Sequence, residues 1–382
     1  MSRSRGQGDH VREQNRGLRI VSIGGGTGLS SLLSGLKAHV GEDCLAAATD
    51  AAWVEMLTAV VTVTDDGGSS GRLREEFQIL PPGDIRNCMV ALAEDERLLT
   101  QLFQYRFESG GDLAGHSFGN LFLAALTGVT GDFFEAIKVS SEVLAIKGRI
   151  FPSTVQDVTL VAEFEDGRTI RGESKIVAAR APISRLRLSH PCRPLGETLE
   201  AIAEADLITI GPGSLYTSII PNLLVDGIVE ALNQSPAMKA YICNVMTQPG
   251  ETDGFTVEDH LRALLEHSPA LKLDYVIVNA APIHRELREK YLADGAVQVE
   301  FTAESLCDGE IPIKLRIGQE PQARSILVLC DNLVSEHNVV RHDPQQLAQV
   351  VLNIHQRHLT PPFSFSPARR DLLSSPHPGN ES

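Results

Sequence analysis

A cluster of glycines directly after the first apolar stretch most constrains how this chain folds. Residues 18–23 are apolar and predict a strand, and a helical pattern of leucines begins at Leu29. Between them stand Gly24, Gly25, Gly26, Thr27 and Gly28. A glycine turn between a strand and a helix is how α/β proteins build anion sites, because backbone amides and the positive end of the helix dipole meet there. An ordinary turn would explain one or two glycines, whereas three in a row predict close approach by a ligand.

The spacing of these glycines excludes two familiar phosphate loops. Counted from Gly24, the dinucleotide fingerprint needs a glycine where Leu29 stands. Counted from Gly26, it needs one where Ser31 stands. No Gly-Lys-Ser or Gly-Lys-Thr follows, so the loop of P-loop enzymes is absent as well.

The overall charge argues against a nucleic-acid partner. The 382 residues are 42% hydrophobic, enough to bury a sizeable core, and their formal net charge is -15. No basic run offsets this charge. An anionic ligand would therefore need local amides, single cations or a metal.

Cysteine spacing and the apolar stretches indicate a cytoplasmic protein. The six cysteines are far apart, which favours reduced thiols over a zinc site or a disulfide framework. Residues 1–17 are polar and basic without an apolar centre, so they do not resemble a signal peptide. The longest apolar stretches are interrupted by proline and polar residues, and we expect no membrane partner.

The order of apolar segments predicts one domain between two tails. Residues 1–17 and 359–382 have the composition of disordered tails, which leaves residues 18–358 as a single α/β domain. Short apolar strands alternate with helices, which predicts a doubly wound, mostly parallel sheet with helices on both faces. A β-branched segment at about 150–180 surrounds Glu165-Asp166-Gly167-Arg168 and predicts a small inserted β-hairpin subregion.

The apolar periodicity also places individual elements. The expected strands are 18–23, 57–64, 155–164, 169–176, 207–210, 239–244 and 275–279. The expected helices are 29–40, 84–94, 96–107, 117–130, 133–144, 284–293 and 344–356. Asp343 precedes the last helix as its N-cap, with proline in the next position.

A second glycine-rich turn follows the strand expected at 57–64. It contains Asp65, Asp66, Gly67, Gly68, Ser69, Ser70, Gly71 and Arg72. We expect it at the carboxyl edge of the sheet, beside the first turn. Two adjacent carboxylates project in different directions, so one can face a metal or substrate while the other caps amides, and such oxygen ligands suit Mg²⁺. The alternative is a solvated acidic turn with an Asx cap.

Two further polar segments begin helices. Asp84 can cap its helix, and Arg86 and Asn87 in the first turn can reach an anion, although an arginine there is also compatible with an ordinary surface charge. His116 is either a structural hydrogen bonder or a site residue. Asn120 lies on an otherwise apolar helix, and its amide needs a partner, for which a ligand is one candidate.

Two loops in the second half of the chain also follow strands. They contain Gly211, Gly213 and Ser214 in the first loop and Asn244, Thr247 and Gln248 in the second. The first loop is either an anion-binding loop rich in backbone amides or a plain strand–helix turn. The second loop either recognises a base, ribose or sugar or is a well-capped loop. Loops after parallel strands converge on one edge of the sheet, so together these segments predict a phosphate-bearing ligand, a nucleotide.

Five of these segments, taken together, resemble the gluconeogenesis factor (YvcK-like) family. That family is related to 2-phospho-L-lactate transferase, the CofD-like enzymes of deazaflavin cofactor synthesis. The matching segments occur in order at 24–29, 64–74, 81–87, 116–120 and 211–218. The resemblance covers about residues 18–358 and leaves out both tails and the segment 41–55, which is longer than the usual connection.

The resemblance implies a doubly wound fold, a cytoplasmic location and homodimers. The gluconeogenesis-factor branch is associated with uridine-diphosphate sugars such as UDP-N-acetylglucosamine and with cell shape or wall synthesis during gluconeogenic growth. The transferase branch moves phospholactate from a guanosine diphosphate ester to the deazaflavin alcohol, with Mg²⁺. Asp65, Asp66 and Asp84 stand where the metal-binding positions of that branch fall. The run Gly-Gly-Ser-Ser-Gly-Arg continues as in the gluconeogenesis-factor branch, which counts against deazaflavin activity.

Two later residues fit a nucleotide-sugar ligand. Arg341 either binds a diphosphate through two hydrogen bonds or is a surface arginine. Tyr291 either stacks on a base or sugar or belongs to the edge of the core. We expect a nucleotide-sugar-binding regulatory protein, with a Mg²⁺-dependent transferase as the alternative. A dinucleotide-dependent oxidoreductase is disfavoured, because the fingerprint fails and no acidic residue ends a strand about 20 residues further on.

Overall fold

The computed structural model of the protein describes residues 16–41, 53–94, 97–109, 111–301, 310–317, 320–336 and 339–359. The two tails that the sequence predicts to be disordered lie almost entirely outside these residues. So does most of the segment 41–55.

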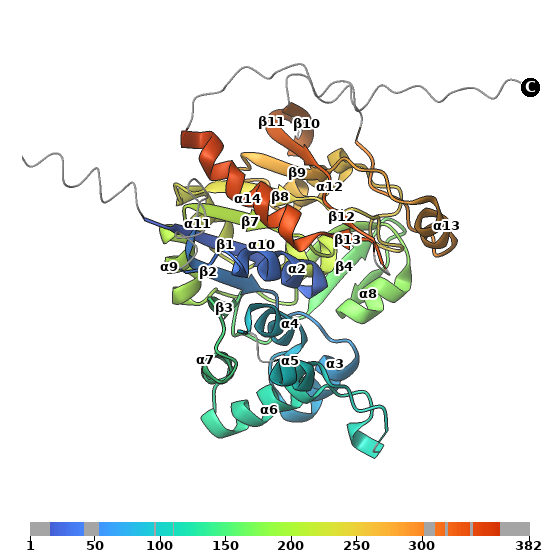
Figure 1. The fold of residues 1–382 in the computed structure, drawn as a ribbon. Coiled ribbons are helices and arrows are strands. Elements are labelled where there is room, and N and C mark those ends of the chain that lie inside the picture. Colours follow the sequence, from blue (N-terminus) through green and yellow to red (C-terminus); the bar gives the residue numbers. More distant parts are fainter. Residues whose placement is uncertain are drawn as a thin grey trace, which may run out of the picture.

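An eight-stranded sheet forms the centre of the molecule (Figure 1). Its strands lie in the order β10-β11-β9-β8-β7-β1-β2-β3, and all neighbours are parallel except the edge pair β10 and β11. The strands are β1 (Leu18–Gly24), β2 (Val54–Val61), β3 (Arg149–Pro152), β7 (Leu207–Ile210), β8 (Met238–Ile242), β9 (Tyr275–Asn279), β10 (Glu310–Ile317) and β11 (Glu320–Asp331).

The strand order reverses between β1 and β7. Strand β1 pairs with β2 on one side and with β7 on the other, so that Ile20 lies opposite both Leu57 and Leu207. Loops that leave two such strands run to opposite sides and open a crevice at the carboxyl edge of the sheet. The first glycine turn follows β1 and the Gly211 turn follows β7, so both lie at this crevice.

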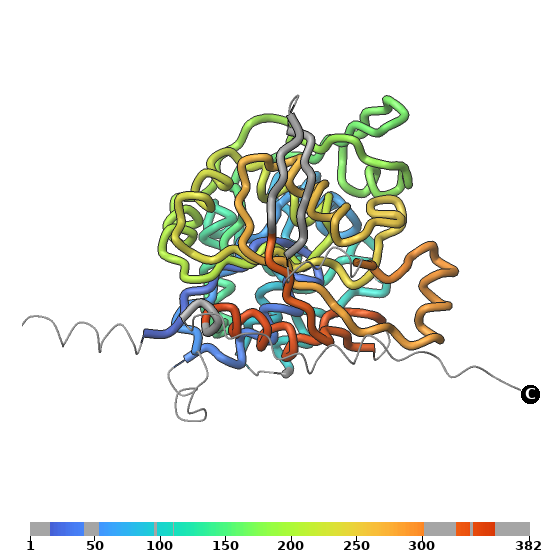
Figure 2. The backbone as a smooth tube through the Cα atoms, turned by 90° about the horizontal axis from the view of Figure 1, so that it is seen from above, coloured from blue at the N-terminus to red at the C-terminus, as the bar shows by residue number. Residues whose placement is uncertain are grey.

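Helices connect most of the strands. They are α2 (Gly26–Lys37), α3 (Gly68–Phe77), α4 (Gly83–Leu92), α5 (Arg97–Gln104), α6 (Phe118–Thr130), α7 (Phe133–Val143), α8 (Glu173–Ala179), α9 (Gly196–Glu204), α10 (Ile220–Leu223), α11 (Ile228–Gln234), α12 (Val257–His267), α13 (Arg285–Ala293) and α14 (Pro344–Leu359). A 3₁₀ turn forms at Gly111–Leu113 and a π-helical turn at Leu215–Ile219. The last helix, α14, lies beside α2 (Figures 1 and 2).

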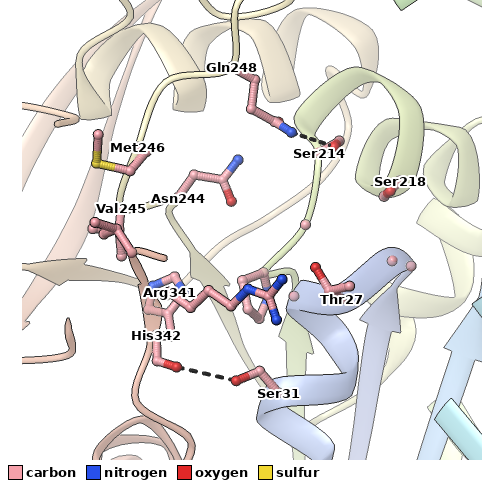
Figure 3. A pocket seen from close by; sticks show the side chains of 16 residues that line it. Thr27, Ser31, Ser214, Ser218, Asn244, Val245, Met246, Gln248, Arg341 and His342 are labelled. Atoms are coloured by element: carbon pink, nitrogen blue, oxygen red, sulfur yellow. Dashed lines mark hydrogen bonds between the residues drawn. The ribbon is translucent and has the colours of Figure 1, made fainter. Parts of the chain in front are cut away.

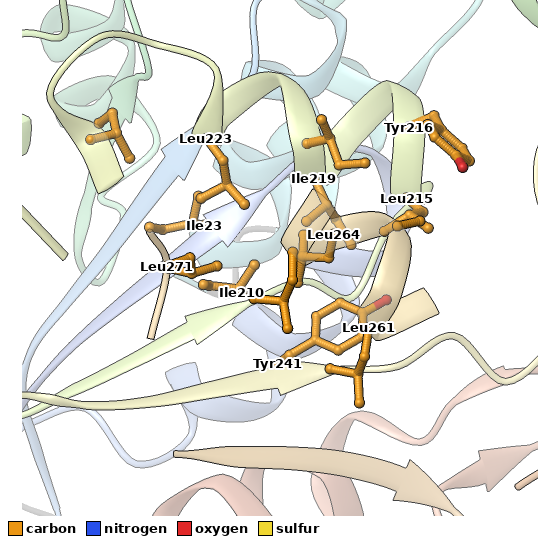
Figure 4. Packing of buried hydrophobic residues seen from close by; sticks show 14 of the residues in the cluster. Ile23, Ile210, Leu215, Tyr216, Ile219, Leu223, Tyr241, Leu261, Leu264 and Leu271 are labelled. Atoms are coloured by element: carbon orange, nitrogen blue, oxygen red, sulfur yellow. The ribbon is translucent and has the colours of Figure 1, made fainter. Parts of the chain in front are cut away.

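The helices cover both faces of the sheet, because successive strand residues enter two different cores. Val21 and Ile208 belong to one buried cluster, and Ile20 and Leu207 belong to the other. The first cluster packs under α9, α11 and α12 (Figure 4), and the second packs under α2, α4 and α14. The predicted α/β fold with a doubly wound, mostly parallel sheet is confirmed.

A small antiparallel sheet is inserted between β3 and β7; it overlaps the predicted region at about 150–180 and extends past it to Leu188. It consists of β5 (Thr169–Arg171), β4 (Leu160–Phe164) and β6 (Ile183–Leu188), in that order. The hairpin across residues 165–168 is confirmed, but the strand expected to run on to residue 176 is wrong. Gly172 adopts φ +102°, which ends β5, and α8 begins at the next residue.

The start of α3 differs from the prediction, whereas the start of α14 agrees with it. Residues 68–71, predicted to be part of a turn, are the first turn of α3. Asp343 caps α14 as predicted, because its carboxylate accepts the amides of Gln345 and Gln346. A short ribbon of β12 (Val334–Ser335) and β13 (Arg341–His342) precedes this helix.

Helix length and hydropathy give one limited result on membranes. No single helix in the described part of the chain is long and apolar enough to cross a bilayer. The segments Leu215–Leu223 and Ile228–Gln234 reach the required length only when they are counted together across a 72° bend.

Candidate functional site

A cavity of about 220 Å³ opens where the strand order reverses, at the carboxyl ends of β1, β7 and β8. We call it the switch-point cavity. It is lined by Gly25, Gly26, Thr27, Gly28, Ser31, Pro212, Gly213, Ser214, Ser218, Asn244, Val245, Met246, Gln248, Val340, Arg341 and His342. The loops that follow β1, β7 and β8, which are far apart in the sequence, thus meet β13 at one place. The sequence predicted that these loops would lie together.

The glycines of the first turn serve the protein's own packing as well as the cavity. Gly26 adopts φ +64°, which a larger residue tolerates poorly. A Cβ atom on Gly25 would lie 2.6 Å from a carboxylate oxygen of Asp84, and one on Gly28 would lie 2.7 Å from the backbone oxygen of Pro212. Two of the glycines therefore allow other parts of the chain to approach closely, which the ligand-based interpretation did not foresee.

The start of α2 supplies hydrogen-bond donors to the switch-point cavity. Thr27 and Gly28 lie in the first helical turn, whose amides have no partner within the helix. The N-cap residue Gly25 offers no side-chain cap, and the first turn holds no acidic residue. The positive end of the helix dipole is therefore unopposed by an acidic side chain of that turn and favours an anion.

Among the described residues that line the switch-point cavity, Arg341 is the only one with a permanent charge, and His342 is the only other titratable one. Its side chain points into the cavity toward Thr27, and the carboxamide of Asn244 also projects inward (Figure 3). The Arg341 guanidinium makes no hydrogen bond or ion pair with any residue in the described part of the chain, so none of those residues occupies its donors.

Polar side chains on the opposite wall are held by hydrogen bonds. The Gln248 carboxamide donates to the Ser214 hydroxyl at 2.7 Å (Figure 3). The Ser31 hydroxyl donates to the backbone oxygen of His342 at 3.2 Å, which ties α2 to the β13 ribbon. The first contact joins the loops that follow β8 and β7, and the second joins α2 to β13.

His342 is a cavity residue that the sequence did not reveal. Its side chain is 7% exposed, and burial lowers its pKa to about 4, although it is hydrogen-bonded to the backbone of Cys243. Its Nε2 atom is buried without a partner among the described residues. The imidazole is therefore neutral at physiological pH and adds no charge to the wall beside Arg341.

A second cavity of about 190 Å³ lies beside the acidic turn. We call it the acidic-turn cavity. It is lined by Asp65, Gly67, Gly68, Ser69, Ser70, Gly83, Asp84, Arg86, Asn87, Arg106 and Asn120. The two glycine turns thus line two adjacent cavities rather than opposite walls of one, which corrects the expectation of a single convergent site.

Asp84 separates the two cavities. Its carboxylate lines the acidic-turn cavity and accepts a hydrogen bond from the amide of Gly26, which lines the switch-point cavity. Burial, followed by the charge of Asp65, raises the pKa of Asp84 to about 6. Asp84 lies within the first turn of α4, whereas the N-cap position belongs to Pro82, so the prediction that Asp84 caps this helix is wrong.

The two other predicted metal-binding carboxylates both accept backbone amides. Asp65 accepts the amide of Gly67 at 2.8 Å and still lines the acidic-turn cavity. Asp66 accepts the amide of Ser174 at 2.8 Å and thereby caps α8 of the inserted subregion. Among the residues with described side chains, no three of histidine, cysteine, aspartate and glutamate are grouped so as to hold a metal. A magnesium ion would therefore rely on Asp65 and Asp84 and on oxygens of its ligand.

Ser69, His116 and Asn120 form a buried hydrogen-bonded network at the acidic-turn cavity. The Asn120 amide donates to the Ser69 hydroxyl at 3.1 Å, and Ser69 lies 2.9 Å from His116 Nδ1. Burial lowers the pKa of His116, which favours the neutral ring, and Nδ1 of a neutral ring can accept the Ser69 hydrogen. His116 contacts Ser69 without lining either cavity, which places it in a supporting role.

The remaining predicted residues line neither cavity, and their contacts explain why. The Tyr291 hydroxyl accepts the amide of Val340 at 2.9 Å, and its ring packs behind the cavity wall. The Thr247 hydroxyl accepts the amide of Val297, and Arg72 donates to the backbone of Ala114. Gly24 and Gly211 make backbone hydrogen bonds at the ends of their strands, Gly24 through its oxygen and Gly211 through its amide.

Several lining residues were not predicted from the sequence. They are Ser31, Gly83, Arg106, Pro212, Ser218, Val245, Met246, Val340 and His342. Most of them neighbour a predicted residue, so the loops were the correct signal. Arg106 is the exception, because it lies in an ordinary polar segment after α5 with no glycine or strand end to mark it.

The fold and the position of the cavities identify a doubly wound α/β protein whose candidate site is at the switch point. The model of the family described as 2-phospho-L-lactate transferase CofD matches residues 20–314. The chain is 46% identical to the gluconeogenesis factor of Bacillus subtilis, over 88% of this chain and 98% of that protein. It is 45% identical to the gluconeogenesis factor of Halalkalibacterium halodurans, over 87% and 95%.

Solved structures agree with this relationship. A crystal structure of a Bacillus halodurans protein superposes with a TM-score of 0.78 at 45% identity, covering 88% of this chain and 100% of that one. The chain belongs to the gluconeogenesis factor family, which is part of the wider CofD family.

Proposed function

We propose that this protein binds a nucleotide sugar, a uridine-diphosphate sugar such as UDP-N-acetylglucosamine, in the switch-point cavity. The observation that carries the proposal is the meeting, at one cavity, of the Thr27 and Gly28 amides at the start of α2 with the guanidinium of Arg341, which bonds to no described residue. A diphosphate presents two adjacent anionic groups, and this cavity offers two separate sets of donors for them.

The other polar groups of the cavity suit the rest of such a ligand. Asn244 presents a carboxamide with both donors and an acceptor, which matches the amide and carbonyl edge of a pyrimidine or the hydroxyls of a sugar. Gln248 and Ser214 hold each other in place and offer further polar atoms. Val245, Met246 and Val340 supply an apolar surface for a ring.

The biological role we propose is regulatory. The curated relatives carry the name gluconeogenesis factor, which supports a role in gluconeogenic growth. The further parts of the proposal, a cytoplasmic homodimer needed for cell shape or wall synthesis, rest on the family resemblance of the sequence. The ligand would then report the supply of wall precursors.

Isothermal titration calorimetry with UDP-N-acetylglucosamine tests the binding, with and without Mg²⁺. We expect saturable heat with one site per chain. Absence of heat at millimolar ligand under both conditions would contradict the proposal. UDP and uridine serve as shorter ligands, and affinity should fall in the order nucleotide sugar, UDP, uridine as the diphosphate is lost.

A second candidate function is transfer of a phosphoester group, as the CofD family match suggests. The carboxylates of Asp65 and Asp84 lie together near the wall between the cavities, and with ligand oxygens they fit Mg²⁺, which would neutralise a diphosphate. In such a step the acceptor hydroxyl oxygen bonds to phosphorus and the bond from that phosphorus to the nucleotide breaks. A nucleoside monophosphate leaves, and the hydroxyl proton passes to solvent.

An assay with the deazaflavin alcohol and the guanosine diphosphate donor of phospholactate separates the two functions. Release of guanosine monophosphate that stops in Asp84→Asn would favour the transferase. Calorimetric binding of UDP-N-acetylglucosamine without any such release would favour the regulatory protein.

A further inference from the structure

We propose that the acidic-turn cavity is a second ligand site, separate from the nucleotide-sugar site, and that it binds a phosphate monoester or inorganic phosphate that keeps a hydrogen on one oxygen. The cavity lies on the far side of Asp84 from the switch-point cavity. Its volume of about 190 Å³ is several times the roughly 30 Å³ that one water molecule occupies in the liquid.

Three helices begin at this cavity, and their first turns line it. Gly68, Ser69 and Ser70 belong to α3, Gly83 and Asp84 to α4, and Asn120 to α6. The first turn of α3 holds no acidic residue and has no side-chain cap. Arg86 and Arg106 also line the cavity, and the Nε atom of Arg86 is buried without a partner among the described residues. These groups provide donors for an oxyanion.

The same cavity also presents acceptors, which an oxyanion without hydrogen cannot satisfy. Asn120 is 2% exposed. Its side-chain amide donates one hydrogen bond to Ser69, and its carboxamide oxygen has no partner in the described part of the chain. A buried, unpaired acceptor is costly, so a ligand that donates a hydrogen bond to it binds more strongly. This observation is independent of the helix starts.

The charges around the cavity lead to the same ligand. Asp65 and Asp84 oppose Arg86 and Arg106, so the cavity has no excess of positive charge for a fully ionised oxyanion. A carboxylate repels such an ion but accepts the hydrogen of a P–OH group. Phosphate and its monoesters retain that hydrogen in part near neutral pH, whereas sulfate has none. The cavity should therefore distinguish phosphate from sulfate.

Calorimetric titration of the full-length protein with inorganic phosphate and with sulfate, at equal ionic strength and pH 6.5, tests this site. We expect saturable phosphate binding at millimolar concentration or tighter, and sulfate binding at least tenfold weaker. Equal affinity for the two ions, or no phosphate binding at 20 mM, would overturn the proposal.

Matched variants show where the phosphate binds. Arg106 and Arg72 are both exposed arginines that donate to neighbouring backbone oxygens, of Gly115 and Ala114, but only Arg106 lines the cavity. We expect Arg106→Gln to weaken phosphate about tenfold, as loss of a charged hydrogen bond does, and Arg72→Gln to leave it within twofold. Equal loss in both variants would show a general charge effect and contradict the proposal.

Two more variants separate this site from the nucleotide-sugar site. Asn120→Leu keeps the size of the side chain but removes the unpaired acceptor, and it should weaken phosphate binding at least tenfold while thermal unfolding confirms a folded protein. Arg341→Met should leave phosphate binding intact; loss there would place the ion in the switch-point cavity instead. UDP-N-acetylglucosamine titrated into Arg106→Gln reports the first site alone, so failure of either proposal is recognised separately.

Discussion

The carboxylate of Asp84, at the start of α4, accepts a hydrogen bond from the backbone amide of Gly26, at the start of α2. This contact joins the loops that follow β1 and β2 and forms part of the wall between the two cavities. Gly25 must lack a side chain for the contact to exist, since a Cβ there would lie 2.6 Å from the Asp84 carboxylate. An acidic group is thus held close to the amides that we assign to a diphosphate.

Asp84→Asn should make the protein more stable at neutral pH. Burial raises the pKa of Asp84 from 3.8 to about 6, so between pH 4 and 6 the native state binds a proton that the unfolded state has released. The free energy of unfolding therefore falls as pH rises through this window, by up to roughly 2–3 kcal/mol. Urea denaturation at pH 4.5, 6 and 7.5 should show a smaller fall in the variant.

The exposed Asp112 provides the control for this measurement, because Asp112→Asn should leave the pH profile unchanged. The free energy of unfolding of Asp84→Asn will still fall with rising pH, since burial also raises the pKa of Glu173 well above its usual value and that of Glu251 to about 7. An unchanged profile in Asp84→Asn would contradict the burial of this charge.

Gly28→Ala should destabilise the protein by about 1–3 kcal/mol, as overpacking typically does. The added Cβ would lie 2.7 Å from the backbone oxygen of Pro212, which cannot move without shifting the turn after β7. Gly24→Ala is the matched control in the same turn, because its Cβ would make ordinary contacts at 3.6 Å. Equal midpoints of thermal unfolding in the two variants would refute this account of the turn.

Arg341→Met should weaken UDP-N-acetylglucosamine at least tenfold without changing stability. The guanidinium is exposed, points into the switch-point cavity and makes no contact with a described residue that its loss would break. Loss of one charged hydrogen-bonding group to a ligand typically costs about 1.5–3 kcal/mol. Calorimetry measures the affinity, and Arg288→Met on the exposed face of α13 is the control. Similar affinity in both variants would show that Arg341 does not contact the ligand.

Asp66→Ala should loosen α8 while leaving ligand binding intact. The carboxylate caps this helix through the amide of Ser174, and loss of such a cap costs about 0.5–2 kcal/mol. Hydrogen exchange of residues 173–179 should become faster. Asp132→Ala removes the corresponding cap from α7, at the amide of Glu135, and should affect only that helix. A loss of nucleotide-sugar binding in Asp66→Ala but not in Asp132→Ala would show that Asp66 contributes to the ligand site.

Much of the fold followed from local patterns in the sequence. Strands β7 and β9 have the predicted bounds, because each is a short apolar run between clear turn signals. The inserted region was harder to predict. Residues 173–176 were predicted to continue a β-branched strand, yet they form a helix because Gly172 turns the chain and Asp66, 108 residues before Ser174, caps that helix. A cap supplied from so far away leaves no local trace.

The candidate site was predictable at the level of loops but not of cavities. Strand ends rich in glycine identified nearly every lining segment, because such loops share one edge of a parallel sheet. The separation into two cavities depends on Asp84 meeting Gly26, a contact between the second and first turns that no spacing encodes. His342 and Arg106 were missed for a related reason, since burial and the path of the chain bring them to the site.

The central pairing of β1 with β7 has a consequence for synthesis. Ser22 and Thr209 share a hydrogen bond between these strands although 187 residues separate them. At the roughly 5–20 residues per second of translation, the second edge of β1 remains unpaired for about 10–40 s after it leaves the ribosome. Nascent chains that end before residue 207 lack the strand that covers this edge, and we expect them to be the species most prone to aggregation and most dependent on chaperones.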